Sequence, residues 1–318
     1  MFVSFLSSAI NLSATFLYGS TGEIITEKSG HLNLGIPGVM SVGAAAGCLT
    51  VFYMLKAKIY SSALLIILPL LATIAAGGLM GLLYSFMTVT LRSNQNVTGL
   101  AMTTLGVGLA GHLMNHTKGV GIIAKASQFY SNLFEIQSDN WFVEIFLSHG
   151  ILVYLAIVIA IVAQIILNRT RVGLHLRAVG ESPATADAAG INVTGYKYVA
   201  TIVGSAIAAI GGLFAIMDYM GGNWEYILEG FGWLSIALVI FTLWRPALSI
   251  LGSLIFGGLY IANNYIVNAI HITLAQQELF KLLPYVMTII VLIITSIIGN
   301  KKAQAPGSLG LNYFREER

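Results

Sequence analysis

The chain has 318 residues, of which 57% are hydrophobic and 9% are charged, and its mean hydropathy is +0.83. Soluble globular proteins carry about 25% charged residues, so this composition excludes that class and indicates an integral membrane protein. The net charge of +3 is too small to indicate nucleic-acid binding, and a single cysteine, Cys48, excludes an intramolecular disulfide.

The first apolar run covers residues 2–19, and no Lys or Arg precedes Lys28. A secretory signal peptide needs a basic start and a cleavage site made of small residues. We therefore expect residues 2–19 to be retained as the first transmembrane helix.

Further runs are long enough to span a bilayer, which takes about 17–25 apolar residues. They lie at 34–54, 61–90, 97–114, 150–167, 199–220, 247–270 and 282–299. A shorter run at 232–244 suits a tilted, broken or re-entrant helix, and counting it gives about nine spans. Run 61–90 is too long for one straight span, so we expect it to bend at Gly77-Gly78 or Gly81, or to emerge on one side of the membrane.

The mixed segment at 115–149 separates two of these runs. Within it, residues 126–147 alternate aromatic and polar side chains, which suits a short helix lying in the membrane interface. The apolar runs continue on both sides of this segment, so we expect residues 1–318 to form a single transmembrane domain.

Lys and Arg set the expected orientation, because cytoplasmic loops are enriched in both. If the N-terminus is outside and nine segments each cross once, eleven basic residues lie in the cytoplasm. The five outside are Lys56, Lys58, Lys118, Lys125 and Lys281. The inverse orientation reverses this ratio, so we expect an external N-terminus, with the polar stretch 172–197 and the tail 300–318 in the cytoplasm.

Two pairs of segments suggest an internal repeat. Residues 33–47 and 230–244 are apolar runs with glycine near the start, and Gly-rich runs follow them at 72–86 and 247–261. An odd number of crossings separates the copies, so the repeat would be inverted, as in many transporters. Two unrelated Gly-rich hairpins would look similar, so the sequence leaves both interpretations open.

Residues 172–197 form the longest strongly polar interruption between apolar runs, and their centre has the signature of a short helix. Ser182 can cap it, Pro183 suits its first position, and Gly190 suits a left-handed stop. The intervening alanines favour about two turns, too few for a helix that is stable alone in water. The segment is therefore either an ordinary extramembrane loop or a rigid coupling helix that inserts into a partner protein.

In the coupling interpretation, small side chains allow close approach to the partner's groove. Charged side chains, exposed on or beside the helix, then pair with charges at the rim of that groove. The candidate coupling residues are Arg177, Glu181, Ser182, Pro183, Ala184, Asp187, Ala188 and Gly190.

Polar residues within or beside apolar runs are candidates for a substrate pathway, because in lipid they must face water or polar partners. These candidates are Asn33, Asn94, Gln95, Asn96, Thr98, Trp224, Asn263 and Asn264. The alternative is that the amides only hydrogen-bond neighbouring helices. A lining of this kind suits a neutral nucleoside or sugar. A stand-alone secondary carrier or channel would need an ion-coupling carboxylate at the midplane, for which Asp218 is the nearest candidate.

Catalytic chemistry is not expected from this chain. It lacks a G-x-x-x-x-G-K-[ST] phosphate loop, so ATP hydrolysis would fall to another subunit. Its six histidines show no metal-ligand spacing, and no Ser, His and acid cluster is suggested. We therefore predict no catalytic residues, no metal and no cofactor.

The string GLHLRAVGESPATADAAGINV at 173–193 resembles the cytoplasmic coupling loop of nucleoside permeases in bacterial ABC importers. Those permeases belong to the larger branched-chain amino acid and simple-sugar permease family. Segments 25–38, 90–102, 230–246 and 305–318 also resemble signatures of this family. The chain departs from the family at Pro37, where an acidic residue is usual.

The resemblance implies a permease subunit that forms the translocation path of an ABC importer in the bacterial plasma membrane. Its implied substrate is a nucleoside, with a simple sugar or riboflavin as alternatives. Its implied partners are a second homologous permease subunit, a cytoplasmic ABC ATPase and an extracellular substrate-binding lipoprotein.

Overall fold

The structure is a computed structural model that describes residues 2–115, 117, 121–131, 140–224, 228–270, 279, 282–298 and 304–314. The side chains of 263–270, 295–296 and 298 lie outside this description. All regular structure in the described ranges is helical, without a strand.

Six helical segments are long and apolar enough to cross a membrane. They are α1 (Phe2–Glu27), α2 (Ile36–Lys56), α3 (Ser62–Ser85) with the π-helix η1 (Phe86–Thr90), α4 (Gln95–Asn115), α7 (Ile151–Arg169), and α10 (Val193–Phe214) with the π-helix η2 (Ala215–Tyr219). Three further apolar helices are α11 (Leu228–Phe241), α12 (Pro246–Ile270) and α14 (Leu283–Ile298). The expected all-α membrane architecture is confirmed, whereas the count of about nine spans stays a prediction.

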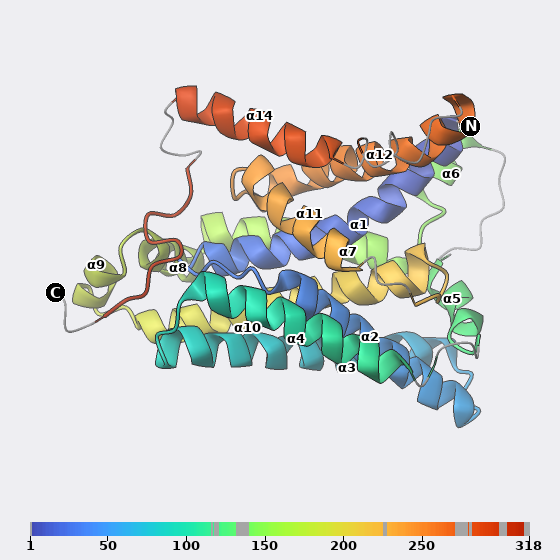
Figure 1. Cartoon of the computed structure of the whole chain (residues 1–318), viewed down its shortest axis with the longest axis horizontal. Helices are drawn as coiled ribbons and strands as arrows, with labels where there is room; N and C mark the ends of the chain where they lie inside the picture. Colours follow the sequence, from blue (N-terminus) through green and yellow to red (C-terminus); the bar gives the residue numbers. More distant parts are fainter. Residues whose placement is uncertain are drawn as a thin grey trace.

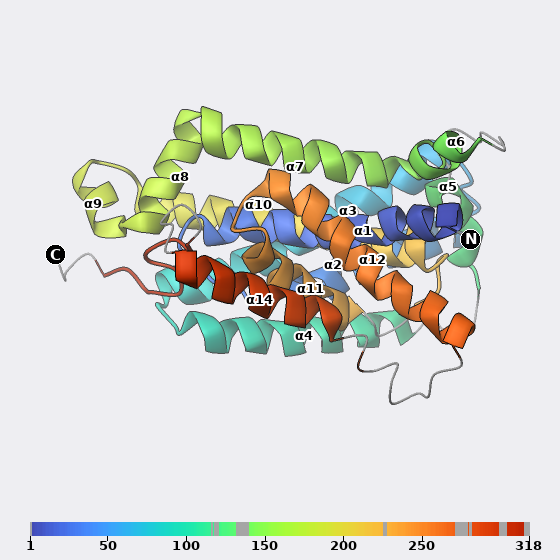
Figure 2. The ribbon, with the colours of Figure 1, turned by 90° about the horizontal axis from the view of Figure 1, so that it is seen from above.

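The long helices run side by side, so the connections gather at two ends of the molecule (Figures 1 and 2). One end, called the tail end, contains segment 28–35, the α3–α4 turn at 91–94, helices α8 (Arg171–Glu181) and α9 (Pro183–Ala188), and residues 304–314. The opposite end contains segment 57–61, helices α5 (Ala124–Ser131) and α6 (Trp141–Phe146), and residues 220–224. The tail end lies on the left in Figure 1.

Helices α1 and α10 form the centre of the bundle. α1 packs against α10, α11 and α12, and α10 packs against α2 and α3. At the α1–α10 crossing, a Cβ atom on Gly22 would overlap the Gly204 carbonyl oxygen. A Cβ on Gly212 would likewise overlap the Met40 carbonyl oxygen of α2. Small residues allow this close backbone approach. In lipid, van der Waals contacts of this kind drive helix association, because lipid chains are as apolar as the side chains and supply no hydrophobic driving force.

α3 continues through Gly77, Gly78 and Gly81 without a break in helical structure. Gly77 and Gly81 instead pack against Ala209 and Ser205 of α10. The segment changes to a π-helix only at Phe86–Thr90. The glycines serve close packing, and a bend at them stays a prediction.

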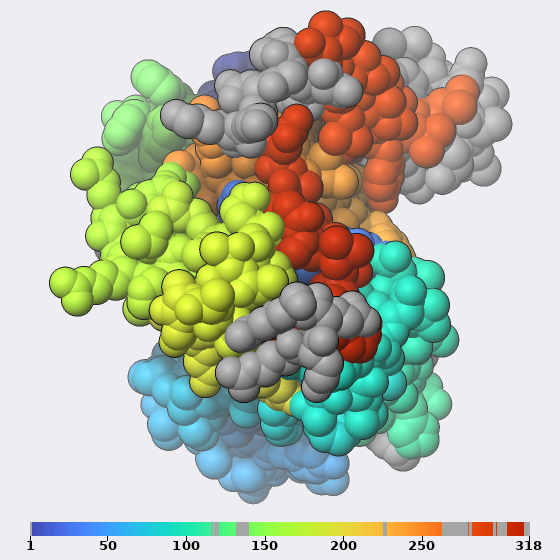
Figure 3. Space-filling view, turned by 90° about the vertical axis from the view of Figure 1, so that its left-hand side faces the viewer, coloured from blue at the N-terminus to red at the C-terminus, as the bar shows by residue number. Residues whose placement is uncertain are grey.

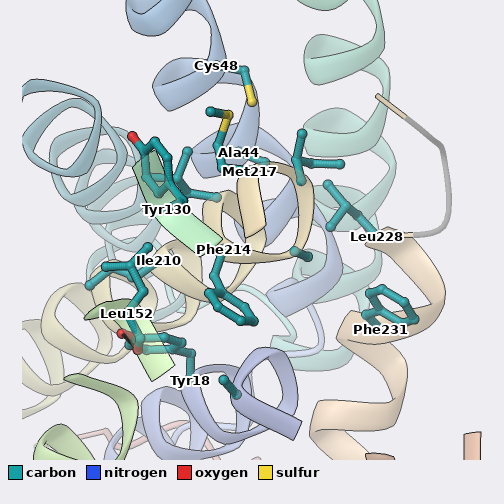
Figure 4. Packing of buried hydrophobic residues seen from close by; sticks show 14 of the residues in the cluster. Tyr18, Ala44, Cys48, Tyr130, Leu152, Ile210, Phe214, Met217, Leu228 and Phe231 are labelled. Atoms are coloured by element: carbon teal, nitrogen blue, oxygen red, sulfur yellow. Dashed lines mark hydrogen bonds between the residues drawn. The ribbon is translucent and has the colours of Figure 1, made fainter. Parts of the chain in front are cut away.

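Aromatic and aliphatic side chains fill the space between α1, α2, α7, α10 and α11 (Figure 4). Phe16 meets Phe231 edge to face, with ring centroids 5.6 Å apart. The Tyr18 hydroxyl donates a hydrogen bond to the Leu152 carbonyl at 2.7 Å, which satisfies a buried polar group on α7. Cys48 is buried in this cluster, where it acts as a small apolar residue.

Candidate functional site

The polar stretch after α7 folds into two helices rather than one. Helix α8 is capped by Thr170, whose hydroxyl accepts a hydrogen bond from the Gly173 N–H at 3.2 Å. The Ser182 hydroxyl then accepts from the Thr185 N–H and caps α9, with Pro183 in its first position. Gly190 ends the segment with φ +81°. The predicted cap, first residue and stop of α9 are confirmed, while α8 was missed.

A stripe at helical spacing would have revealed α8. Gly173, Leu176, Val179 and Gly180 are buried on one side of this helix. Arg171 before this stripe and Arg177 within it gave the segment the composition of a loop. Because α8 buries its apolar stripe, α9 stands on a folded base rather than on a free loop.

α9 exposes its small residues and buries one of them. Ala184 and Ala188 are exposed, whereas Ala186 is buried against Val179 of α8 and Val193 of α10. The exposed face of α9 is thus flat and free of large side chains. This is the geometry expected of a helix that docks into a groove, although the docking itself stays a prediction.

The charged residues beside α9 differ in their environments. Glu181 is exposed, as expected, and its Oε2 accepts a hydrogen bond from the Gly307 N–H at 3.2 Å. Asp187 is half-buried rather than exposed, and its Oδ2 accepts from the Tyr313 hydroxyl at 2.8 Å. Arg177 is also half-buried. The sequence did not reveal that two of these carboxylates bind the C-terminal part of the same chain.

Residues 304–314, called the strap, run across the face of the tail end (Figure 3). On one side the Ser308 N–H donates to the Gly180 carbonyl at 2.9 Å. On the other side the Asn312 side-chain amide donates to the Arg92 carbonyl at 2.8 Å. Arg92 also lies over the Phe314 ring, 5.0 Å from its centroid. The strap therefore links α8 and α9 to the α3–α4 turn.

Segment 28–35 lies beneath the strap and is largely buried although it is irregular. Side chains satisfy its backbone groups, as a buried irregular segment requires. The Leu32 N–H donates to Gln95 Oε1 at 2.9 Å, and the Leu32 carbonyl accepts from the Tyr84 hydroxyl at 2.6 Å. The Leu34 carbonyl accepts from Thr103 at 2.7 Å.

Three of the predicted pathway residues take part in this network or border it. Gln95 is buried and also donates from Nε2 to the Leu311 carbonyl at 3.2 Å. Asn33 is buried, and its Oδ1 accepts from the Gly35 N–H at 2.9 Å just before α2. Thr98 is buried beside Ser93, with hydroxyl oxygens 2.8 Å apart. These contacts are those of capping and packing, and a role in the pathway stays a prediction.

The other pathway candidates lie elsewhere. Asn94 and Asn96 are exposed at the start of α4, where Asn94 Oδ1 accepts from the Val97 N–H at 3.1 Å. Trp224 is half-buried at the opposite end. Asn263 and Asn264 fall within the backbone of α12, but their side chains lie outside the described residues. The structure thus brings Asn33 and Gln95 together and keeps Trp224 apart from them.

Two buried carboxylates at the end of α1 were missed by sequence reasoning. Glu23 accepts a hydrogen bond from the Asn33 N–H at 2.9 Å, and Glu27 accepts from the Trp244 indole N–H. Both glutamates are buried one helical turn apart. Their i, i+4 spacing at the end of an apolar run was the available signal. They tie α1 to the connections that lead into α2 and α12.

Asp218 also lies away from the position an ion-coupled carrier requires. It sits in η2, which packs on α5 of the opposite end, and its Oδ1 accepts from the Asn11 amide at 3.0 Å. In the described residues, no group of three or more His, Cys, Asp or Glu side chains is arranged to hold a metal ion.

Basic side chains line a cavity of about 660 Å³ on one flank of the tail end. Among the described residues of its wall, Lys28, Arg177 and Arg245 accompany one carboxylate, Glu181. Burial lowers the pKa of Lys28, and the Arg177 charge acts in the same direction against the opposing Glu181 charge. This flank can therefore accept acidic groups of a partner.

The chain is similar over most of its length to known transport proteins. Residues 5–292 match the family described as the permease component of the branched-chain amino acid transport system. The nucleoside ABC transporter permease NupC of Lactococcus lactis is 32% identical over 96% of this chain and 95% of its own length. The guanosine ABC transporter permease NupQ of Bacillus subtilis is 28% identical over 96% of this chain and 95% of its own length. A putative glucose permease of Haloferax volcanii, TsgC13, is 27% identical over 98% and 97%.

Proposed function

The chain belongs to the branched-chain amino acid transport system permease family, and on this premise we propose that it forms the translocation path of an ABC importer for nucleosides. The observation that carries the proposal is its full-length similarity to two permeases named for nucleosides and guanosine. A simple sugar is the second candidate, because a putative glucose permease is also similar over the full length. Riboflavin is a further alternative.

Partner subunits complete the proposed importer. The sequence has no phosphate-binding loop, so ATP hydrolysis would belong to a cytoplasmic ABC ATPase. A second, homologous permease would enclose the path together with this chain. An extracellular lipoprotein would deliver substrate to the end that contains Trp224.

The proposed topology has nine crossings, an external N-terminus and a cytoplasmic tail end. The excess of basic residues at the tail end supports it. A cysteine at exposed position Thr185, in a Cys48→Ala background, tests it in whole cells with a membrane-impermeant thiol reagent. Labelling only after permeabilisation is the expected result, and labelling of intact cells contradicts the topology.

We also propose an inverted repeat that relates α1–α4 to the set α10, α11, α12 and α14. Helix packing supports this relation, because α10 packs on α2 and α3 as α1 packs on α11 and α12. Within each half, α2 packs on α4 as α11 packs on α14. The substrate path of such folds runs between the two halves.

Coupling would then begin at the exposed alanines of α9 and pass through the strap. Closure of the ATPase would push α9, and the hydrogen bonds of Ser308 and Asn312 would carry that displacement to the α3–α4 turn. Gln95 would pass it to segment 28–35 and to the start of α2. This chain of contacts joins the coupling helices to both α2 and α4.

The substrate is tested with the purified complex of both permeases, ATPase and lipoprotein in lipid nanodiscs. ATP hydrolysis is measured with adenosine, guanosine, cytidine, glucose and riboflavin. Stimulation by one or more nucleosides, without stimulation by glucose or riboflavin, is the expected result. Stimulation by glucose alone would assign the importer to simple sugars instead.

A further inference from the structure

A second polar cavity, called the α10 cavity, lies on the other flank of the tail end. Its volume is about 260 Å³. Its walls come from six segments: segment 28–35, the π-helix η1, the α3–α4 turn, α9, the start of α10 and the strap. The residues used in the argument below are His31, Arg92, Asp187, Thr194, Lys197 and Tyr313. None of these six residues was a predicted pathway residue, and Asp187 alone among them was a predicted coupling residue.

Lys197 is the unusual member of this wall. Its side chain is only 2% exposed. Within the described part of the chain, it makes no side-chain hydrogen bond or ion pair. Burial of the side chain reduces the hydration of its ammonium group, which is unfavourable for a charge without a partner. An anion bound in the cavity would therefore supply Lys197 with a partner.

The start of α10 supplies the second feature. Asn192, Val193 and Thr194 line the cavity at the N-terminus of this 22-residue helix. The Asn192 side chain accepts only the Gly195 N–H, at 2.9 Å. The N–H groups of the first turn have no intrahelical acceptors, and the helix dipole favours negative charge at this position.

The remaining charged groups leave the cavity basic. Arg92 lines the cavity from the α3–α4 turn, as Lys197 does from α10. The carboxylate on the wall, Asp187, accepts a hydrogen bond from the Tyr313 hydroxyl. His31 is buried, which lowers its pKa, and the Lys197 charge lowers this pKa further. His31 therefore adds no positive charge at neutral pH, and the described residues of the wall contribute two cations, Lys197 and Arg92, and one carboxylate, Asp187.

We propose that the α10 cavity binds a phosphate group, held by Lys197, Arg92 and the first turn of α10. Phosphate suits this combination, because a helix N-terminus and basic side chains together bind its oxygens with several N–H donors. The group can come from a soluble phosphate compound or from a lipid headgroup. A bound phosphate would link α10 to the α3–α4 turn and, through Asp187 and Tyr313, to α9 and the strap.

The test measures thermal stabilisation of the purified permease in detergent and in a buffer free of phosphate. The probes are inorganic phosphate, guanosine monophosphate, guanosine and short-chain phosphatidylglycerol. Lys197→Met removes the charge and keeps an unbranched side chain. Arg171→Met is the matched control, because Arg171 is an exposed cation at the same end but not on the cavity wall.

The expected result is saturable stabilisation of the wild-type protein by a phosphate probe and not by guanosine. The affinity should fall at least about tenfold in Lys197→Met and stay unchanged in Arg171→Met. Stabilisation by the soluble phosphates identifies a soluble compound as the source, whereas stabilisation by the lipid alone identifies a headgroup. Three results would overturn the proposal: no stabilisation by any of the phosphate probes, stabilisation of Lys197→Met equal to that of the wild type, or stabilisation by guanosine equal to that by a phosphate probe.

If Lys197→Met does not yield folded protein, Thr194→Pro replaces it. Proline is tolerated in the first turn of a helix, and it removes one N–H donor from the proposed site. Weaker phosphate binding with unchanged melting of the unliganded protein supports the site. Unchanged phosphate binding argues against the participation of the helix N-terminus.

Discussion

The centre of the bundle and the tail end are held together by different contacts. In the centre, α1, α2 and α10 cross at Gly22, Gly204 and Gly212, where backbones touch and no larger side chain fits. At the tail end, polar side chains of α3 and α4 satisfy the backbone of segment 28–35, and the strap binds α8 on one side. The centre is held mainly by close backbone packing, whereas the tail end combines such packing, as at Gly180 against the Lys28 carbonyl, with hydrogen bonds from side chains to backbone.

This difference indicates which region moves. Close backbone contacts have discrete arrangements and resist small shifts. The exposed hydrogen bonds of the strap, such as those of Gly307 and Asn312, can exchange partners with water at a small net cost, because each is worth only about 0.5–1.5 kcal/mol. We therefore expect rigid helices in the bundle and rearrangement at the tail end, where a partner would push on α9.

The largest expected effect follows a substitution in the centre. Gly212→Leu places a side chain into the Met40 backbone of α2, so the helices cannot approach. Overpacking costs about 1–3 kcal/mol where neighbours can adjust, and backbone cannot move aside as a side chain can. We expect loss of monodisperse protein in size-exclusion chromatography. Gly108→Leu is the control, because nothing lies within 4 Å of a Cβ there; equal loss in both variants would contradict the packing argument.

The next largest effect concerns transport rather than folding. Ala188→Trp adds a bulky side chain to the exposed face of α9, so the permease should fold normally. ATPase copurification and substrate-stimulated ATP hydrolysis should fall together by at least about tenfold. Ala247→Trp, at an exposed alanine of the same end, is the control. If Ala188→Trp retained full ATPase copurification and full substrate uptake, α9 would not be the coupling element.

A smaller effect is expected from Gln95, which links segment 28–35 to the strap. Gln95→Ala leaves the N–H of half-buried Leu32 without its acceptor, at a cost of about 1–3 kcal/mol. The melting temperature should fall, and protease cleavage within 304–314 should become faster because the Leu311 contact is also lost. Asn96→Ala, one residue away and exposed, should match the wild type within about 0.5 kcal/mol. Equal melting temperatures and equal cleavage rates of the two variants would show that Gln95 does not link the strap to segment 28–35.

The smallest effect is a pH dependence at the tail end. The pKa of His31 is well below its usual value because the side chain is buried and faces the Lys197 charge. The folded state thus favours neutral His31, and this contribution to stability is present above the unfolded pKa of about 6.5 and is lost as the pH falls below it. Its slope is at most about 1.4 kcal/mol per pH unit.

We expect the melting temperature to fall between about pH 6.5 and 5, and this fall to be shallower in His31→Gln. His112→Gln, at an exposed histidine of α4, should retain the wild-type pH dependence. Identical pH profiles for His31→Gln and the wild type would show that His31 does not titrate with unfolding.

Local features of the coupling region were predictable, because a cap, a first-turn proline and a left-handed glycine act within a few residues. The Ser182–Gly190 helix is the example. α8 was missed because its apolar stripe of Leu176 and Val179 is narrow and lies between charged residues. Its stability depends on packing against α10 and the strap, which a local pattern does not reveal.

The sequence by itself determined the all-helical membrane class and the polar residues at the ends of the helices. Composition and run length suffice for this, because the bilayer requires apolar spans of fixed length with internal backbone hydrogen bonds. Only the tertiary structure decided the partners of those polar residues. Gln95 meets Leu311, and Asp187 meets Tyr313, across more than a hundred intervening residues. Such pairs form because the packed helices bring distant connections to one end, where each buried polar group must find a partner.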